Sequence, residues 1–314
     1  MKLHLHSKKR QNQRGIALLL VLAVIAILGI IIVGLWEVSE YSQDDRSKEK
    51  FKFQAKQLAE SGGAIAMHPD VPPGDPVLRK DFGDGRSYSV RITTEGGRIR
   101  INSIHDEIIR ATVLELFIRW GVDASAAAIA TDSLADWIDT DSEPSPNGAE
   151  KVFYTSLEYP QYPLNRDFTS LEEMLLVRGM DQVARINPRW RDYFTLYSDG
   201  VIDVNAAPAE TLEALFLTTQ DSARSFEAAR NGNDGIVGTE DDYVYQDENE
   251  VKSALGLSDD DWNRVASWVT LENSLRRIES TGTVGNYSYR LVILAEISGE
   301  GRNKEVTPVA RISE

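Results

Sequence analysis

The sequence predicts an α+β fold in which an N-terminal transmembrane and amphipathic helix packs on a small antiparallel sheet, with a large all-α domain inserted between strands. Residues 16–36 form an uncharged, apolar run of twenty-one residues, and a helix of that length spans about 30 Å, one hydrocarbon core. Strand-like alternation occurs around residues 87–102 and returns after residue 287. Between them the apolar residues recur with a helical period, which predicts that helices interrupt the sheet.

The segment before the apolar run, Met1–Gly15, carries five basic residues and no acidic residue. The positive-inside rule therefore keeps this segment in the cytoplasm and places the residues after Trp36 across the membrane. A secretory signal would have a shorter apolar stretch and a small-residue cleavage site after it, and no such site follows Trp36. A cut between Gly15 and Ile16 would free a hydrophobic helix with its amine at the membrane edge. An anchor that is never cleaved is the alternative.

Beyond the apolar run, residues 37–67 are polar with spaced apolar positions, which indicates that the helix continues outward as an amphipathic helix. The proline-rich stretch 68–76 ends it, because proline and glycine cannot continue a helix. Residues 87–93 and 98–102 alternate like strands and are joined by a Glu-Gly-Gly turn, so we expect them to form a hairpin.

The middle of the chain has a helical period, and Asp123, Thr169 and Ser258 are good N-cap residues. Helices are expected at 107–120, 124–137, 170–177, 208–217 and 259–268. The strand pattern returns at 287–297 and 306–312. The predicted division is therefore a leader at 1–15, a transmembrane helix at 16–36, a stalk helix with the first strands at 37–104, an inserted α-helical domain at 105–280, and C-terminal strands that complete the sheet at 281–314.

Composition limits the function. The chain has no cysteine and a formal net charge of −15, which becomes −20 without the five leader cations. Such a body should repel nucleic acid and attract divalent cations. Segments 170–179 and 202–212 each resemble half of a helix-hairpin-helix module, but the second has no Lys or Arg, so we interpret both as structural. No nucleotide-binding or hydrolase motif is visible, which favours a protein that is not an enzyme.

An acidic block follows the second predicted helix. Asp139, Asp141 and Glu143 alternate along the chain, and Glu150 lies just beyond a turn rich in Pro, Asn and Gly. Carboxylates at alternate positions of a turning loop can converge on one hard cation, and calcium takes six to eight oxygen ligands in flexible geometry. The spacing is not that of an EF-hand, so a solvated acidic loop is the alternative. Asp136, on the preceding helix, is expected to cap or orient the loop.

A second acidic stretch lies near residues 231–250. Its turn-forming Asn-x-Asn-Asp-Gly sequence also suits calcium loops. Candidate ligands are Asn231, Asn233, Asp234, Asp241 and Asp242. A plain acidic surface loop is the preferred interpretation.

The junction between Gly15 and Ile16 resembles the type IV prepilin leader, where a dedicated peptidase cleaves after the glycine and methylates the new N-terminus. Pilins generally carry Glu at the fifth mature position, which here is Leu20. The lack of this Glu is characteristic of one minor pseudopilin of type II secretion, called K. Several blocks, in this order, resemble that minor pseudopilin K family, also called general secretion pathway protein K: 136–144, 147–150, 162–166, 171–180 and 202–212.

The resemblance implies a pilin-like fold and a subunit at the tip of the type II secretion pseudopilus, which helps initiate and cap the filament and supports protein export across the outer membrane. Minor pseudopilins I and J, the prepilin peptidase and the inner-membrane secretion platform are the implied partners. The chain would be a single-pass inner-membrane protein with its C-terminal domain in the periplasm. The resemblance also implies structural calcium, and favours Asp139, Asp141 and Glu150 as ligands. The rivals are a stably anchored periplasmic scaffold or binding protein, and a minor pilin of a type IV pilus.

Overall fold

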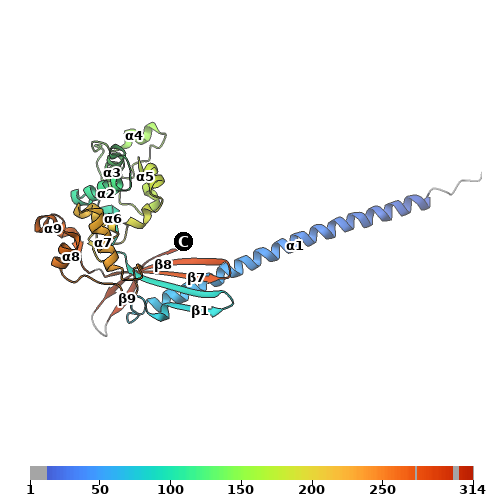
Figure 1. Cartoon of the computed structure of the whole chain (residues 1–314). Helices are drawn as coiled ribbons and strands as arrows, with labels where there is room; N and C mark the ends of the chain where they lie inside the picture. The colour runs from blue at the N-terminus through green and yellow to red at the C-terminus, as the bar shows by residue number, and fades with distance from the viewer. Residues whose placement is uncertain (1–12, 273, 300–303, 314) are drawn as a thin grey trace, which may run out of the picture.

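The computed structural model describes the backbone of residues 13–272, 274–299 and 304–313. Within these ranges it describes the side chains of residues 18–33 and 48–312. Figure 1 shows three parts: the long helix α1, a sheet that packs on its C-terminal portion, and a helical lobe on the other side of the sheet. The mixed fold with an antiparallel sheet and a large helical part is as predicted.

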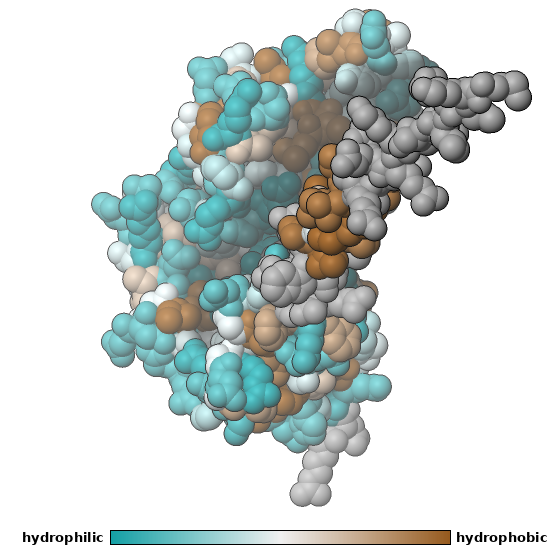
Figure 2. Space-filling view, turned by 90° about the vertical axis from the view of Figure 1, so that its right-hand side faces the viewer, coloured by the Kyte–Doolittle hydropathy of each residue, from teal (hydrophilic) through white to brown (hydrophobic). Residues whose placement is uncertain are grey.

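Helix α1 runs from Gln13 to Ala66 and ends before the proline-rich stretch, where residues 67–71 form turns. Its final turns bury small side chains, among them Ala55, Ala59 and Ala66, against the sheet. Among the residues of α1 with described side chains, those at 18–33 are apolar and exposed, and they form a hydrophobic band in Figure 2. No helix in the described part of the chain is both long and apolar enough to cross a membrane. The predicted span 16–36 includes side chains outside that part and stays a prediction.

The main sheet is antiparallel, with the order β1-β2-β7-β8-β9. Its strands are β1 (Arg79–Gly83), β2 (Arg86–Thr94), β7 (Leu275–Val284), β8 (Tyr287–Ser298) and β9 (Glu305–Ser313). One face packs on α1 through Val90, Ile278, Leu291 and other apolar residues. Because side chains alternate along a strand, the opposite face carries Arg91, Glu279 and Arg290. The late strands predicted at 287–297 and 306–312 are confirmed as β8 and β9.

The predicted hairpin between 87–93 and 98–102 is wrong. Strand β2 pairs instead with β1 and β7, and β3 (Ile99–Arg100) pairs in parallel with β4 (Phe194–Thr195). The Glu-Gly-Gly turn leads into the helical lobe. There the carbonyl of Gly96 accepts a hydrogen bond from the Asp203 N–H, which holds the turn against the lobe. A Cβ at Gly97 would clash with the backbone of Ala206, so this close contact requires glycine.

The chain leaves the sheet after β2 and returns at β7. Strand β7 begins at Leu275, inside the range 105–280 that the sequence assigned to the helical insert. The C-terminal strands therefore begin earlier than the predicted residue 281. Its pattern was hidden because Arg276, Arg277 and Glu279 interrupt the apolar residues, although Arg277 and Glu279 are buried.

The helical lobe confirms the helices predicted at 107–120, 124–137 and 208–217, while 170–177 is a 3-10 helix and 259–268 divides into α9 and η5. Asp123 and Ser258 cap their helices as predicted, but Thr169 does not, because the helix begins one residue later. The α-helices of the lobe are α2 (Glu107–Arg119), α3 (Ala124–Ile138), α4 (Lys151–Ser156), α5 (Met180–Ile186), α6 (Ala209–Phe216), α7 (Gln220–Arg230), α8 (Glu248–Leu255) and α9 (Asp259–Val265).

The structure also contains short 3-10 helices and two-residue strands. They are the 3-10 helices η1 (Pro76–Leu78), η2 (Ile101–Ser103), η3 (Leu171–Leu176), η4 (Trp190–Tyr193) and η5 (Ala266–Trp268), and the paired strands β5 (Ile202–Asp203) and β6 (Val269–Thr270). The lobe has its own large hydrophobic core, which is separate from the cluster between α1 and the sheet.

Replacement of Gly282 by Ala should weaken the attachment of α1 to the sheet. A Cβ at Gly282 would clash with the carbonyl oxygen of Ala55 and lie 2.5 Å from the backbone nitrogen of Ala59. Such overpacking typically lowers the free energy of unfolding by about 1–3 kcal/mol. The midpoint of urea unfolding measures the change, with Ser288→Ala as a control at an exposed position of the neighbouring strand β8. Equal midpoints for Gly282→Ala and the parent chain would contradict the prediction.

Candidate metal centre

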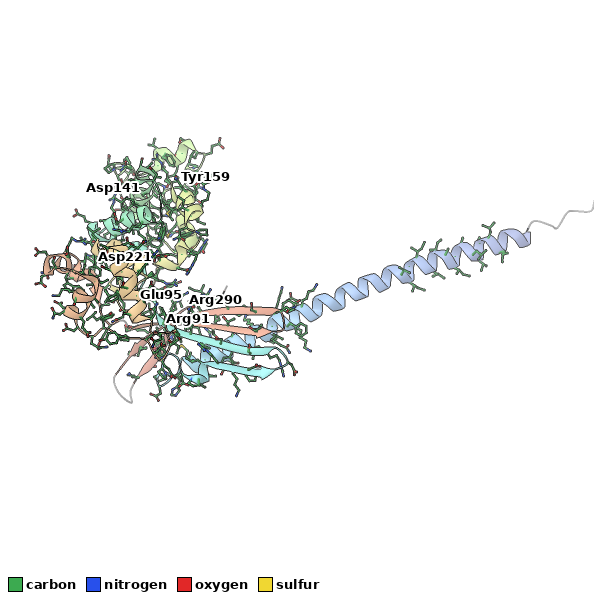
Figure 3. All side chains as sticks on the ribbon, viewed as in Figure 1. Arg91, Glu95, Asp141, Tyr159, Asp221 and Arg290 are labelled. Carbon is green, nitrogen blue, oxygen red and sulfur yellow. The ribbon has the colours of Figure 1, made fainter. Side chains whose placement is uncertain are left out.

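Three carboxylates from the end of α3, the following loop and the start of α4 meet at the edge of the helical lobe. Asp139, Asp141 and Glu150 each offer one oxygen, and these oxygens lie within 4.8 Å of one another. Asp139 is the C-cap of α3, Asp141 follows in the loop, and Glu150 is the N-cap of α4. Figure 3 shows Asp141 at the surface of this part of the lobe. The structure thus brings together the three residues that the sequence favoured.

The cluster has oxygen atoms without hydrogen-bond partners. Asp139 Oδ1 and Glu150 Oε1 are buried, and neither has a partner among the described residues. Burial, followed by the charges of Asp141 and Asp136, raises the pKa of Asp139 to about 6. Burial also raises the pKa of Glu150. Because desolvated, mutually repelling carboxylates are unfavourable alone, the donor set fits a bound cation.

Asp136 holds the loop in place from behind. It is fully buried, and both of its carboxylate oxygens accept a hydrogen bond from the backbone N–H of Ser145, each at 3.1 Å from the nitrogen. A Cβ at Gly148 would clash with the Asp136 carboxylate, so the close approach of the loop to Asp136 requires glycine at this position. Asp136 therefore orients the loop, as the sequence suggested.

Asp132, one helical turn before Asp136, has a role that the sequence analysis missed. Its Oδ2 accepts hydrogen bonds from the backbone N–H and the side-chain amide of Asn147, both at 3.0 Å. Its Oδ1 is paired with Arg110 at 2.6 Å. The spacing of four residues between Asp132 and Asp136 was visible in the sequence and places both on one face of α3.

Aromatic residues support the loop from inside the lobe. Trp137 packs against Tyr154, Tyr162 and Phe168, with ring centroids 4.9–6.2 Å apart. The hydroxyl oxygen of Tyr154 accepts a hydrogen bond from the Arg178 N–H. These contacts fix α4, and hence Glu150, relative to α3.

Glu143 is not part of the cluster of carboxylates. It is exposed, and its backbone N–H donates to Asp141 Oδ1 at 2.8 Å. Its contact with the site is therefore through the main chain, and its side chain does not join the three oxygens.

The second predicted loop uses its carboxylates internally. Asp241 Oδ2 accepts the N–H groups of Asn233 and Asp234, and Asp242 Oδ2 accepts that of Gly238. Asn231 Oδ1 accepts a hydrogen bond from Arg230. Within the described ranges, no second group of three acidic, histidine or cysteine ligands lies close enough to hold a metal ion. The geometry favours the plain acidic loop.

The predicted processing residues lie at the beginning of α1. Gly15 and Ile16 fall within the helical backbone, but their side chains are outside the described set. Leu20, the fifth residue after the predicted cut, is 63% exposed. Most of the predicted leader, residues 1–12, lies outside the described residues.

Comparisons with known proteins agree on one family. Residues 97–189, which include the three clustered carboxylates, match the family model described as type II secretion system (T2SS), protein K. Type II secretion system protein K of Pseudomonas aeruginosa is 27% identical over 74% of this chain and 76% of its own length. The protein of the same name from Klebsiella pneumoniae is 27% identical over 62% of this chain and 66% of its own length. That from Dickeya chrysanthemi is 42% identical over a shorter stretch, 33% of this chain and 29% of its own.

A solved structure shares the fold. It is a chain in the crystal structure of the GspK–GspI–GspJ complex from the type 2 secretion system of enterotoxigenic Escherichia coli, with a TM-score of 0.59 and 16% identity. The match covers 88% of this chain and 99% of that one. The overall fold therefore recurs in that structure, and the chain is similar in sequence to type II secretion system protein K over the matched stretches.

Proposed function

We propose that this chain is a minor pseudopilin K and occupies the tip of the type II secretion pseudopilus, where it helps initiate and cap the filament. The observation that carries this proposal is the position of the helical lobe. The lobe lies beside the sheet, at the end of the molecule away from the N-terminus of α1 (Figure 1). A further subunit stacked above would meet the lobe, whereas subunits below could pack along α1.

Leu20 supports the same position. In pilin-like filaments a Glu at the fifth mature position lies near the charged N-terminus of the adjacent subunit. Leucine at this position supplies no partner for such a charge, and an unpaired charge in an apolar bundle is unfavourable. A subunit at the tip has no neighbour above it that needs this partner.

Cleavage between Gly15 and Ile16 by the prepilin peptidase, with methylation of Ile16, would precede assembly. Until then residues 16–36 would hold the chain in the inner membrane as a single span, with the sheet and lobe in the periplasm. The exposed apolar side chains at 18–33 are suited to lipid and to the N-terminal helices of other subunits. The inner-membrane secretion platform would then drive assembly.

Minor pseudopilins I and J are the proposed neighbours. The solved structure with the same fold is a complex of GspK with GspI and GspJ. Here α1 has an exposed apolar face along which two more helices could pack, including Phe53, which is 62% exposed. Such packing would bury side chains that otherwise face solvent.

We further propose that the cluster of Asp139, Asp141 and Glu150 holds one structural calcium ion. Three carboxylate oxygens in a flexible loop match the preferences of calcium, and main-chain oxygens and water would complete the coordination. Bound calcium would neutralise the repulsion that raises the pKa of Asp139. Its role would be to fix the loop between α3 and α4.

Substitution of Leu20 by Glu should not increase incorporation of the protein along the pseudopilus. A Glu in the apolar core costs about 2.5–3.5 kcal/mol unless it is paired, and at the tip no subunit above supplies a charged N-terminus. Immunogold counting on isolated filaments, with Leu20→Met as the apolar control, measures this. Labelling at intervals along the filament for the Glu variant would contradict the proposed tip position.

A further inference from the structure

A cavity of about 460 Å³ opens between the outer face of the sheet and a loop of the helical lobe. Arg79, Arg91 and Arg290 line it from three strands, together with Glu279, and the loop contributes residues 236–239. Figure 3 shows Arg91 and Arg290 where the lobe meets the sheet. The cavity is far along the chain from the metal centre, and the proposed function does not use it.

The strand register explains why these charges gather on one face. Arg91 of β2 lies opposite Glu279 of β7, and Thr281 of β7 lies opposite Arg290 of β8. Residues at alternate positions share a face, so all four side chains point away from α1. Residues 236–239 of the lobe lie over this face of the sheet, and the cavity is the space left between them and the strands.

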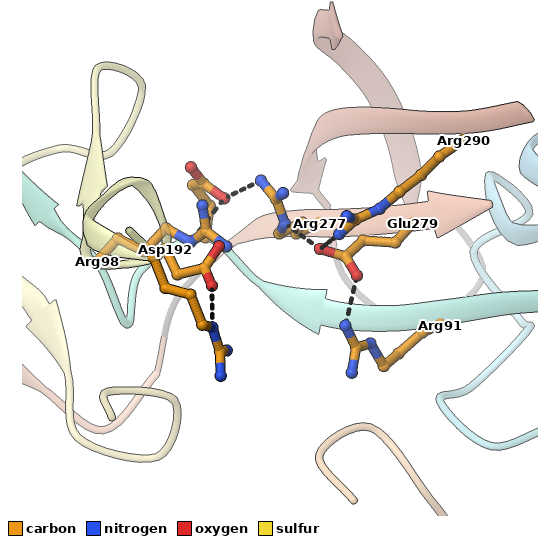
Figure 4. A network of polar contacts seen from close by, with 8 residues as sticks. Arg91, Arg98, Asp192, Arg277, Glu279 and Arg290 are labelled. Atoms are coloured by element: carbon orange, nitrogen blue, oxygen red, sulfur yellow. Dashed lines mark hydrogen bonds and ion pairs between the residues drawn. The ribbon is translucent and has the colours of Figure 1, made fainter. Parts of the chain in front are cut away.

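Glu279 organises the arginines. Its Oε2 accepts a hydrogen bond from Arg91 at 2.5 Å, and its Oε1 accepts one from Arg277 at 2.7 Å and lies 3.2 Å from Arg290 (Figure 4). Burial alone would raise the pKa of Glu279, but the hydrogen bonds from Arg91 and Arg277 lower it to about 2. Glu279 therefore stays ionised and holds three guanidinium groups in fixed positions.

The arginines outnumber the acids at this junction. Glu95, the second acid, is paired with Arg277 at 2.9 Å and lies 3.8 Å from Arg98. Asp192 lies near Arg98 and is paired with Arg189 at 3.0 Å, so the described residues of this network comprise five arginines and three acids, in a chain whose formal net charge is −15. The cavity lining also holds exposed Arg79 and the carboxylate of Asp75, whose Oδ1 accepts a hydrogen bond from the Val77 N–H and caps η1.

The lining defines the chemistry of a ligand. A guanidinium group has five donors in a planar fork that matches a carboxylate, and Arg91 uses only Nη2 in its bond to Glu279. Beside these cations the wall is apolar, with Leu78, Val90 and Ile236, and Ile236 is 47% exposed. A carboxylate with an aliphatic neighbour would satisfy both parts of the wall, whereas a small inorganic anion would leave Ile236 uncovered.

We propose that this cavity binds an acidic segment of a partner protein, whose Glu or Asp carboxylate pairs with Arg79 and Arg91 while an adjacent aliphatic side chain covers Ile236. Residues 240–242 next to the loop are acidic. The site should therefore select one carboxylate at a defined position and repel a long acidic run.

The test measures binding of two labelled peptides to the full chain in detergent by fluorescence anisotropy. Both are capped hexapeptides without other charges, one with the core Leu-Glu-Leu and the other with Leu-Gln-Leu. The Glu peptide should bind at least roughly tenfold more tightly than the Gln peptide. Arg79→Gln should weaken its binding about fivefold or more. Lys80→Gln removes the same charge from the next residue of β1, outside the cavity lining, and should leave binding unchanged.

Three results would overturn the proposal. The first is equal binding of the Glu and Gln peptides, or no saturable binding up to about 1 mM. The second is the same loss for Arg79→Gln and Lys80→Gln, which would mean that only overall charge matters. The third is displacement of the Glu peptide by an equal concentration of inorganic phosphate, which would indicate a site for small anions. Arg91→Lys keeps the charge but loses the planar fork, and it should weaken binding of the Glu peptide as well.

Discussion

Calcium should raise the melting temperature of a fragment spanning residues 37–314, and a chelator should reverse the rise. A ligand that binds only the folded state at 100 times its dissociation constant adds about 2.7 kcal/mol to the free energy of unfolding, which corresponds to about 5 °C or more for a chain of this size. The physical reason is the cluster of Asp139, Asp141 and Glu150, which has buried oxygen atoms without partners.

The effect of calcium should depend on pH in one direction. The pKa of Asp139 in the folded chain is about 6, above its ordinary value of 3.8. Between these values the folded state binds protons more strongly than the unfolded state, so the metal-free fold loses stability as the pH rises to about 6. Calcium replaces those protons, so its stabilising effect should be larger at about pH 7.5 than at about pH 5.

Matched variants separate the site from general ionic effects. Asp139→Asn combined with Glu150→Gln should abolish the calcium-dependent rise, because it removes two of the three carboxylates. Asp234→Asn combined with Asp241→Asn alters the second acidic loop and should leave the rise intact. The parent fragment melting at one temperature with calcium and with chelator would contradict the calcium proposal, and so would a calcium-dependent rise that the first pair of substitutions leaves unchanged.

Substitution of Arg277 by Met should cause a large loss of stability. Arg277 is 5% exposed and Glu95 is 2% exposed, and the two are joined at 2.9 Å. After the substitution Glu279 retains Arg91 and Arg290, but among the described residues Glu95 keeps only an ion pair with the more distant Arg98. Removing one partner of a buried ion pair typically lowers the free energy of unfolding by about 3–5 kcal/mol.

Urea unfolding with a fitted slope measures the loss at Arg277, because the slope shows whether the cooperative unit has changed. Arg311→Met on the exposed part of β9 is the control for loss of one arginine from the same sheet, and it should stay within about 0.5 kcal/mol of the parent. A loss below about 1 kcal/mol for Arg277→Met would mean that the network does not fasten the lobe to the sheet.

The parts of the fold that the sequence revealed have strong periodicity. Helices α2 and α3 and strands β2 and β8 show clear helical or alternating patterns, so their positions follow from burial of one face. Strand β7 was missed because its buried face carries Arg277 and Glu279, which look like solvent-exposed residues until their partners are known. Those partners come from residues more than a hundred positions away, such as Glu95.

The helices α4, α5, α7 and α8 were also missed. Each is eleven residues or shorter, and tertiary packing, more than local propensity, stabilises such short helices. The hairpin error at residues 98–102 has a related cause. Two short alternating runs joined by a Gly-Gly turn satisfy the local rule, but the turn is held instead by distant residues, Asp203 and Ala206.

The site was more predictable than the fold around it. Asp139 and Asp141 occupy alternate positions of the loop, and the turn before Glu150 predicted that the chain brings Glu150 back toward them. The sequence could not show that Glu143 points away, or that the carboxylates of Asp241 and Asp242 accept backbone N–H groups. Those facts depend on loop geometry, which burial patterns do not encode.

The most direct test of the pseudopilin account is the mass of the protein and of its N-terminal peptide, from cells with and without the prepilin peptidase. The account predicts a mature chain that begins at N-methylated Ile16 only when the peptidase is present, and an uncleaved chain that begins at Met1 in its absence. An intact Met1 in both strains would contradict it, and the chain would then be a plain membrane-anchored protein.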